Sequence, residues 1–330
     1  MDVLYPVIDL HADTPEFVLT ENRSRGNTLR DSKGHLDIPR LRAANSLVQA
    51  MAIFAPAHRL DYMPEDYRAD TYFSEVYGEF HQALLTYRAD VAPVDTYEDI
   101  ERNRRDGRLS LLLTLEDGAV IQNELGHLDM LKRLGVRMIT LTWNFANCLG
   151  FPNSRDPQMM AAGLTEFGRE AVLRMQETGV IVDVSHLSDG GFWDVAQLCK
   201  KPFVASHSGC RALHEHPRNL TDDMLRTIGD RGGIVGTTFC AAFLSPDEQM
   251  AHIEDIVRHM QHIRDKAGMD ALALGSDFDG VENGFEFDDF AGLPKLFRAC
   301  EKVFTPREMD QLTHGNALRV FRECFPHNPV

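Results

Sequence analysis

Short apolar runs alternate with longer amphipathic stretches along this sequence. Eight runs are rich in residues that favour strands: Val7–Asp13, Ser46–Phe54, Leu109–Glu116, Arg137–Asn144, Val180–His186, Pro202–His207, Gly233–Phe239 and Ala271–Asp277. Stretches typical of helices lie between or after them: Pro64–Arg88, His127–Leu134, Thr165–Thr178, Phe192–Lys200, Asp222–Asp230, Asp247–Lys266 and Pro306–Phe325. Such alternation is typical of parallel strands covered by helices, and eight strands predict a (β/α)8 barrel of the TIM type.

No linker divides this pattern into separate domains. Pro and Gly stand at the boundaries of predicted elements, as at Gly179 and Pro202, where they end helices or begin strands. A length of 330 residues would suit two domains, but α/β barrels of this size form one. We therefore expect a single barrel domain over residues 1–330, with C-terminal helices after about residue 281.

Charge and composition exclude several classes of partner. The 34 basic and 50 acidic residues give a formal net charge of −16, which repels nucleic acid and anionic lipid. No segment approaches the ~18 consecutive apolar residues of a membrane span, and the first residues do not resemble a signal peptide. The six cysteines are scattered, without the spacing of a disulfide framework or a thiolate metal site. We expect a cytoplasmic protein that binds neither nucleic acid nor membrane.

Polar side chains close five of the predicted strands. The active site of a barrel lies at the carboxyl ends of its strands, so these residues should share one rim. His11 and Asp13 close the first strand, and residues two apart on a strand face the same way. The residues that close the other four strands are Glu116, His186, His207 and Asp277.

These residue types indicate a metal centre. Histidines and carboxylates without thiolates suit Zn²⁺, and also Mn²⁺ or Fe²⁺. A carboxylate such as Glu116 can bridge two ions ~3.5–4 Å apart, an arrangement used for hydrolysis. A single histidine at a strand end is more often a hydrogen-bonded boundary residue, but five such strand ends on one rim favour joint ligation. By contrast, a solvated helix face explains His252, His259 and His262, which fall in a charge-rich helical stretch.

Several motifs, in this order, carry a family resemblance: LHADTP, TLEDG, DVSHLSD, ASHSGCRALHEHPRNL, LGSDFDG and HGNALRVF. The chain resembles the membrane dipeptidase (renal dipeptidase) family of zinc peptidases, family M19, from about Val7 to about Phe325. The resemblance implies a (β/α)8 barrel of the metal-dependent hydrolase type with two Zn²⁺ ions. Because the sequence starts at its first strand and ends without a lipid-anchor tail, it is similar to the soluble bacterial branch.

The resemblance also implies residue roles. His11 and Asp13 match ligands of one zinc, His186 and His207 match ligands of the other, and Glu116 matches the bridging carboxylate. Arg218, in HPRNL, matches the arginine that receives the carboxylate of a dipeptide, a role that suits the guanidinium fork. Asp277 matches the aspartate that takes a proton from the attacking hydroxide and delivers it to the leaving amine.

These roles imply hydrolysis of small dipeptides by metal-bound hydroxide. The family tolerates a D-residue at the C-terminal position, so L,D-dipeptides of the cell-wall type are candidate substrates. A homodimer is compatible with the resemblance.

The fourth predicted strand departs from the family pattern. Trp143 stands where the renal enzyme has a histidine that contacts the carbonyl region of the substrate, and an indole can only donate one hydrogen bond. Asn144 or Asn147 could supply the missing donor. Because a regular strand alternates its faces, we expect only one of Trp143 and Asn144 to line the substrate pocket unless a bulge intervenes.

Three other functions remain open. The same barrel and metals could act on another small amide or ester, which would be favoured if no dipeptide were cut. A metallophosphatase is disfavoured because the proposed rim carries no basic cluster beyond Arg211 and Arg218. A non-catalytic binding protein is disfavoured because every proposed metal position holds a competent ligand.

Overall fold

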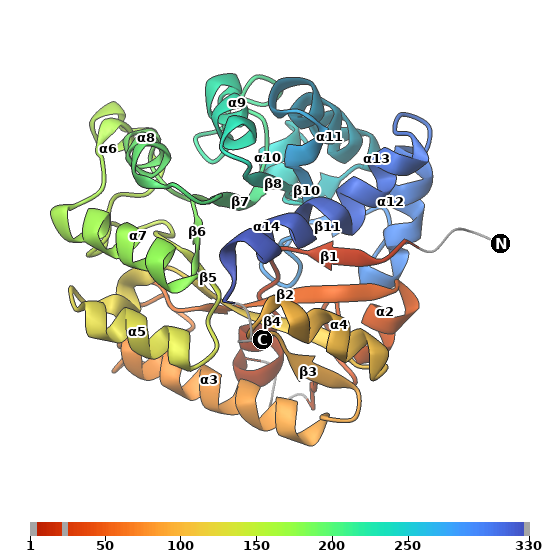
Figure 1. Cartoon of the computed structure of the whole chain (residues 1–330), viewed down its shortest axis with the longest axis horizontal. Coiled ribbons are helices and arrows are strands. Elements are labelled where there is room, and N and C mark those ends of the chain that lie inside the picture. The colour runs from red at the N-terminus through yellow and green to blue at the C-terminus, as the bar shows by residue number, and fades with distance from the viewer. Residues whose placement is uncertain (1–4, 22–25, 327–330) are drawn as a thin grey trace.

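Eight parallel strands form a closed barrel in the computed structural model, which describes residues 5–21 and 26–326 (Figure 1). In order around the barrel they are β1 (Val7–Asp9), β2 (Ser46–Phe54), β4 (Leu109–Glu116), β5 (Met138–Thr140), β6 (Ile181–Asp183), β7 (Val204–Ser208), β8 (Ile234–Thr237) and β10 (Leu272–Leu274). Strand β10 pairs with β1, and this seam closes the barrel. The predicted (β/α)8 fold is confirmed.

Helices follow the strands and surround them (Figure 1). The longer ones are α3 (Ala69–Thr86), α5 (Leu125–Arg133), α7 (Glu166–Thr178), α8 (Asp189–Leu198), α9 (Asp222–Asp230) and α11 (Ile253–Ala267). Several begin at residues whose side chains cap free backbone N–H groups: Thr165, Ser188 and Thr221 each accept one from the first turn. Helix α4 (Tyr97–Arg105) is as long as α5 and α9, and the shorter helices are α1 (Thr14–Glu16), α2 (Ile38–Ala43), α6 (Pro157–Ala161) and α10 (Ala241–Leu244).

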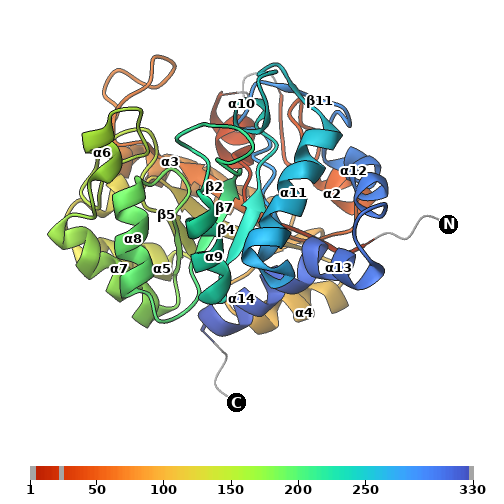
Figure 2. The same cartoon turned by 90° about the horizontal axis from the view of Figure 1, so that it is seen from above.

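The last of the C-terminal helices closes the amino-terminal end of the barrel. The C-terminal helices are α12 (Leu293–Cys300), α13 (Pro306–Asp310) and α14 (Asn316–Cys324), with a π-helical turn, Gln311–Gly315, between the last two. The apolar side of α14, with Val320 and Phe321, packs against the residues that fill the barrel interior: Ile8, Val48, Ala50, Leu112, Met138, Ile181, Val204, Ile234 and Ala273. Figure 2 shows α14 on the side opposite α10 and β11 (Gly284–Phe285). The open end of the barrel is therefore the carboxyl end of its strands.

Several strands are shorter than predicted. β5, β6 and β10 end at Thr140, Asp183 and Leu274, so His186 and Asp277 lie just beyond their strands. Both residues, like Asp117 after β4, have a left-handed backbone, with φ between 65° and 73°. Histidine and aspartate enter this region more readily than most residues. The turn that ends each strand thus directs these side chains.

Two further pairings involve short strands that hydrophobic periodicity does not predict. The three-residue strand β3 (Val91–Pro93) pairs with the first residues of β4, whereas β5 pairs with its last residues. A strand so short, ending in proline, carries too little pattern to be recognised. Strand β9 (Met250–Ala251) pairs with β11 and joins two loops above the barrel.

The expectation for the helical histidines is wrong for one of the three. His259 on α11 is fully buried: its Nδ1 accepts from the Cys210 N–H at 3.0 Å, and its Nε2 lies 3.0 Å from the Leu244 carbonyl. Burial lowers the pKa of His259 to about 4. His252 and His262 are more exposed and pair with carboxylates. An apolar helix face can hold a histidine when both ring nitrogens find partners.

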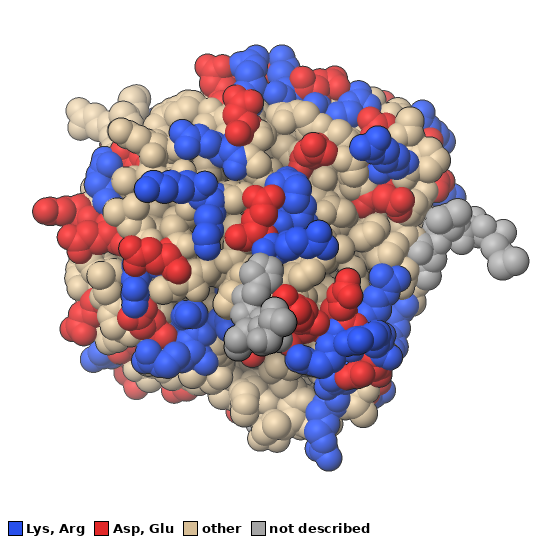
Figure 3. Space-filling view, viewed as in Figure 1, with Lys and Arg blue, Asp and Glu red and all other residues tan. Residues whose placement is uncertain are grey.

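Surface charge is mixed despite the acidic balance. Figure 3 shows basic and acidic side chains interspersed over one face of the molecule. Within the described ranges, no helix combines the length and apolar character needed to cross a membrane.

Candidate metal centre

The structure brings the predicted ligand residues together at the carboxyl end of the barrel. His186 Nε2 and His207 Nε2 lie 3.1 and 3.5 Å from Glu116 Oε1, and 3.1 Å from each other. His11 Nε2 lies 3.7 Å from the second oxygen, Glu116 Oε2, and 3.3 Å from Asp13 Oδ2. The two oxygens of Glu116 therefore face two separate groups of donors.

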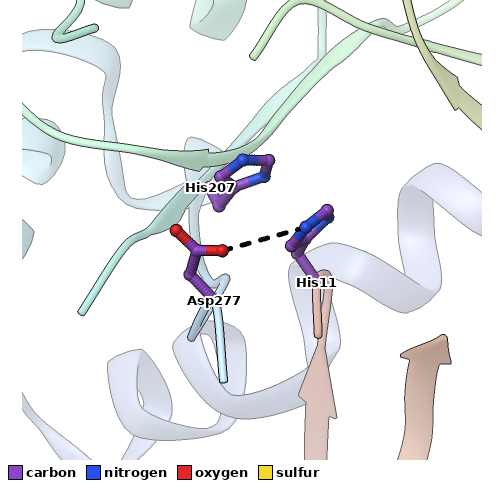
Figure 4. A group of neighbouring side chains, drawn as sticks. All are labelled: His11, His207 and Asp277. Atoms are coloured by element: carbon purple, nitrogen blue, oxygen red, sulfur yellow. Dashed lines mark ion pairs between the residues drawn. The ribbon is translucent and has the colours of Figure 1, made fainter. Parts of the chain in front are cut away.

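Asp277 joins the same cluster from the far side of the barrel seam. Its Oδ1 lies 3.9 Å from His11 Nε2, and Figure 4 shows it facing both His11 and His207. The His11 and His207 rings stack at 3.8 Å between centroids. Asp277 is 7% exposed, so its carboxylate is largely buried at the carboxyl end of the barrel.

Burial and mutual charge shift the pKa values of this cluster strongly. Burial alone would lower the pKa of His11, but the adjacent Asp13 and Glu116 raise it well above its usual value. Burial alone would raise the pKa of Glu116, but the three histidines hold it well below its usual value. Burial, with Glu116 nearby, raises the pKa of Asp13 to about 7 and that of Asp277 to about 6.

The other two histidines are held in the neutral form. Burial, and then the charge of Arg218, lowers the pKa of His186 to about 4. Burial, and then His11, lowers the pKa of His207. Neutral imidazoles are the form that binds metal ions.

The residues present fit a divalent metal centre. Three overlapping groups of buried donors have ligand atoms within 4.8 Å of one another: His11 with Asp13 and Glu116, Glu116 with His186 and His207, and His11 with His207 and Asp277. His11 Nε2 and Asp13 Oδ1 have no hydrogen-bond partner among the described residues, although both are buried. Buried polar atoms without partners are costly, and a cation would satisfy them. Nitrogen and oxygen donors of this kind suit zinc.

A glycine makes room for the carboxylates. A Cβ on Gly280 would lie 2.1 Å from Asp13 Oδ2 and 2.9 Å from Asp277 Oδ1. Both contacts are shorter than van der Waals distance, so a side chain at this position would displace one of the two acids.

A cavity of about 1020 Å³ opens above the cluster. Its floor includes Asp13, Glu116, His186 and Asp277, and an aromatic wall is formed by Phe54, Tyr62 and Trp143. The remaining lining residues are Glu16, Phe17, Lys33, Gly34, His35, Asn144, Cys240, Ala242, Phe243, Glu248, Gln249, Asp279, Gly280, Val281, Glu282 and Asn283. The cavity is large enough for a small substrate above the cluster of candidate metal ligands.

Trp143 and Asn144 both line this cavity, contrary to the expectation that only one would. Strand β5 ends at Thr140, so strand alternation no longer governs residues 143 and 144. The Trp143 ring packs edge-on against Phe54, with centroids 4.8 Å apart. Asn144 Oδ1 lies 3.2 Å from His186 Nδ1, whereas the Asn147 amide nitrogen donates to Asp117 and to the Leu141 carbonyl. The amide nitrogen of Asn147 therefore already has two acceptors, and neither of them lines the cavity.

Arg218 lies beside the cavity without forming part of its lining. Its Nη2 donates to the His207 carbonyl at 2.8 Å, its Nη1 donates to Ser208 Oγ, and its guanidinium lies over the Phe243 ring. Its buried Nε has no partner in the part of the chain that the structure describes. Arg211 is held by Asp189 in a bidentate pair at 2.7 and 2.8 Å.

Sequence reasoning missed the buried polar residues beneath the ligands. Asp9 accepts from Gln49 and from Ser276, and Asp183 accepts from Ser206. Each aspartate interrupts an apolar strand, in VIDL and GVIVDV. That interruption is the one signal that could have singled them out.

Fold and site together define a class: barrel enzymes that hold metal ions between histidines and carboxylates at the carboxyl ends of their strands. The chain belongs to the membrane dipeptidase family, peptidase family M19, whose model matches residues 2–326. Family membership and structural neighbours make it a peptide-hydrolysing enzyme.

Three similar proteins illustrate this membership. A Klebsiella pneumoniae protein described as uncharacterised, from the pqqA 5′ region, is 39% identical over 239 residues, which cover 69% of this chain and 86% of that protein. The crystal structure of a dipeptidase, a metallopeptidase of family M19, has a TM-score of 0.87 at 29% identity and covers 98% of this chain and 99% of its own. A Rhodobacter sphaeroides metallopeptidase, bound to a phosphinate mimic of L-Ala-D-Ala, has a TM-score of 0.86 at 27% identity, with 98% and 100% covered.

Proposed function

We propose that this protein is a dipeptidase with two zinc ions, one on each side of Glu116. The supporting observation is that the two oxygens of Glu116 face separate donor groups, His11 with Asp13 and His186 with His207. Bound zinc ions supply polarisation of the peptide carbonyl and activation of water near neutral pH. The other steps of the reaction fall to side chains of this chain.

Asp277 is the proposed proton carrier. It lines the cavity, faces His11 and His207, and has a pKa that burial raises to about 6. A carboxyl group with a pKa near the working pH can accept a proton from water and then donate it to the leaving amine. Because Asp277 lies beside the candidate ligands, it would be close to both the attacking water and the leaving amine.

Arg218 is the proposed partner of the substrate carboxylate. Its Nε is a buried donor with no acceptor among residues 5–21 and 26–326, and its neighbour Phe243 lines the cavity. A carboxylate that enters between Phe243 and the metal ligands would satisfy this donor. Recognition of a free carboxylate would restrict cleavage to the bond before a C-terminal residue, since a chain that continues past that residue carries an amide there.

Arg218→Ala is expected to raise KM strongly and to abolish the preference for free over C-terminally amidated dipeptides. The guanidinium distinguishes a charged carboxylate from a neutral amide, and alanine cannot. Steady-state kinetics on matched free and amidated dipeptides measures this preference. Arg211→Ala is the control, because Arg211 is paired with Asp189. A preference that survives in the Arg218 variant would refute the assignment.

Trp143 is proposed to narrow the pocket, with Asn144 as a polar contact near the reacting amide. Trp143→Ala is expected to broaden the acceptance of bulky side chains and to leave the rate on Ala-Ala within about tenfold, because it removes a wall and no catalytic proton. Competition between small and bulky dipeptides measures the change. Loss of the Ala-Ala rate by orders of magnitude would instead give the indole a direct role in catalysis.

We further propose tolerance of a D-residue at the C-terminal position. The L-Ala-D-Ala mimic bound by the Rhodobacter sphaeroides relative supports this proposal. The decisive experiment is hydrolysis of a panel of L,L- and L,D-dipeptides by zinc-loaded protein. We expect cleavage of both kinds. A protein that binds zinc and cuts no dipeptide would contradict the proposal and favour another small amide or ester as substrate.

A further inference from the structure

A chain of two hydrogen bonds connects the Nδ1 atom of His207, through Ser206, to Asp183. The Nε2 atom of His207 points to Glu116 and His186, whereas its Nδ1 lies 2.8 Å from Ser206 Oγ. The same hydroxyl lies 2.5 Å from Asp183 Oδ2. The three side chains in this line, Asp183, Ser206 and His207, are each at most 1% exposed.

The donors and acceptors along this chain determine which ring nitrogen of His207 carries the proton. Asp183 accepts four hydrogen bonds, from the N–H groups of Ser185 and Ser206, from Thr140 Oγ1 and from Ser206 Oγ, as an ionised carboxylate does. Ser206 has one hydroxyl proton, and it is donated to Asp183. The Nδ1 of His207 must therefore carry a proton and donate it to Ser206. Its lone pair is then on Nε2, which faces the proposed metal ions.

Backbone packing fixes the middle of the line. Ser206 lies on β7, and a Cβ on Gly236 of β8 or Gly275 after β10 would come within 1.9 or 1.8 Å of the Ser206 carbonyl oxygen. Ser185 Oγ accepts from the His207 N–H at 3.1 Å and lies 3.3 Å from Ser206 Oγ. The backbone that carries Ser206 therefore packs closely against β8 and the end of β10, and its side chain lies among buried polar groups.

His186 has a different partner. Its Nδ1 lies 3.2 Å from the amide oxygen of Asn144, a neutral group on an exposed residue. Of the two Nδ1 atoms, the one on His207 is linked through Ser206 to a buried carboxylate, whereas the one on His186 meets a neutral amide.

We propose that Asp183 and Ser206 are positioning residues that orient His207 as a metal ligand through a carboxylate–hydroxyl–imidazole relay. The relay holds the tautomer whose lone pair is on Nε2 and strengthens that nitrogen as a donor. This inference rests on the proposed role of His207 in metal binding. Partners of this kind contribute about 10–100-fold to metal affinity or activity in other metal sites.

Ser206→Ala and Thr140→Val form a matched pair of variants. Both remove a buried hydroxyl that donates to Asp183 Oδ2, at 2.5 and 2.6 Å, but only Ser206 also touches His207. We expect Ser206→Ala to weaken zinc binding by about 10–100-fold at one of the two sites. Thr140→Val should leave zinc affinity near that of the unaltered protein. Chelator competition measures affinity, and thermal unfolding of the chelated proteins measures any shared loss of stability.

Equal weakening by both variants would show that Asp183 only stabilises the fold, and unchanged affinity in Ser206→Ala would exclude the relay. A second measurement keeps the test valid if Ser206→Ala does not fold. Nitrogen NMR of the unaltered, zinc-loaded protein should place the proton of His207 on Nδ1, and a proton on Nε2 would overturn the inference. Failure of the unaltered protein to bind zinc would instead contradict the proposed function itself.

Discussion

Glu116→Gln is expected to reduce bound zinc from about two ions per chain to one or fewer. A glutamine offers one neutral oxygen, so it cannot bridge two ions, and it removes a negative charge that faces three histidines. The loss in kcat/KM should exceed the roughly 10–100-fold that changes around the ligands produce, because Glu116 is itself the proposed bridge.

Elemental analysis of protein purified without chelator, together with dipeptide kinetics, tests this expectation. Glu248→Gln is a suitable control, since Glu248 also lines the cavity but is exposed and belongs to none of the donor groups. Two ions retained in the Glu116 variant would exclude the bridging assignment. Fewer than two ions in the unaltered protein, with no gain in melting temperature on adding zinc, would contradict the two-metal proposal, because ligands of the native state stabilise it.

Asp277→Asn is expected to lower kcat by about 10²–10⁴-fold while most of the metal is retained. The carboxamide has nearly the same shape as the carboxyl group but cannot take and return a proton at neutral pH. Kinetics and metal analysis on the same preparation are both needed. Asp277 is also one of three donors in the group with His11 and His207, so the variant distinguishes two roles for it. Loss of the ions together with activity would make Asp277 a structural ligand.

Sequence alone could predict the barrel and the meeting of the candidate ligand side chains for a simple reason. Parallel strands bring their carboxyl ends to one rim, so His11, Glu116 and His207 must meet if each closes a strand. The prediction needed only the correct order of strands. It did not depend on their length, so the early ends of β1, β5, β6 and β10 did not affect it.

Strand length did matter for Trp143 and Asn144. Their assignment to opposite faces assumed a strand that continues through residue 144, whereas β5 ends at Thr140. The turn that follows sets both side chains toward the cavity. Nothing in the local pattern of TLTWNFAN marks the end of the strand.

Tertiary contacts decided the residues that sequence reasoning missed. Asp183 meets Ser206 because β6 pairs with β7, and the order of residues along the chain does not show this contact. In the same way, periodicity cannot show that the buried face of α11 accommodates His259. The cavity wall shows the same limit. Gln249 and Asn283 come from separate loops that the pairing of β9 with β11 joins, and two-residue strands have no recognisable signature.

The seam between β1 and β10 also bears on how the protein is made. The Asp9 carboxylate accepts from the backbone and the hydroxyl of Ser276, across 267 positions of the chain. At about 5–20 residues per second, a ribosome needs roughly 13–53 s to add that length, and β1 waits all this time for one of its two neighbours. An unpaired strand edge is a template for aggregation, so the free edge of β1 carries this risk during the interval. A nascent chain that stops before residue 272 has neither the closing strand nor Asp277, which ties completion of the reactive centre to completion of synthesis.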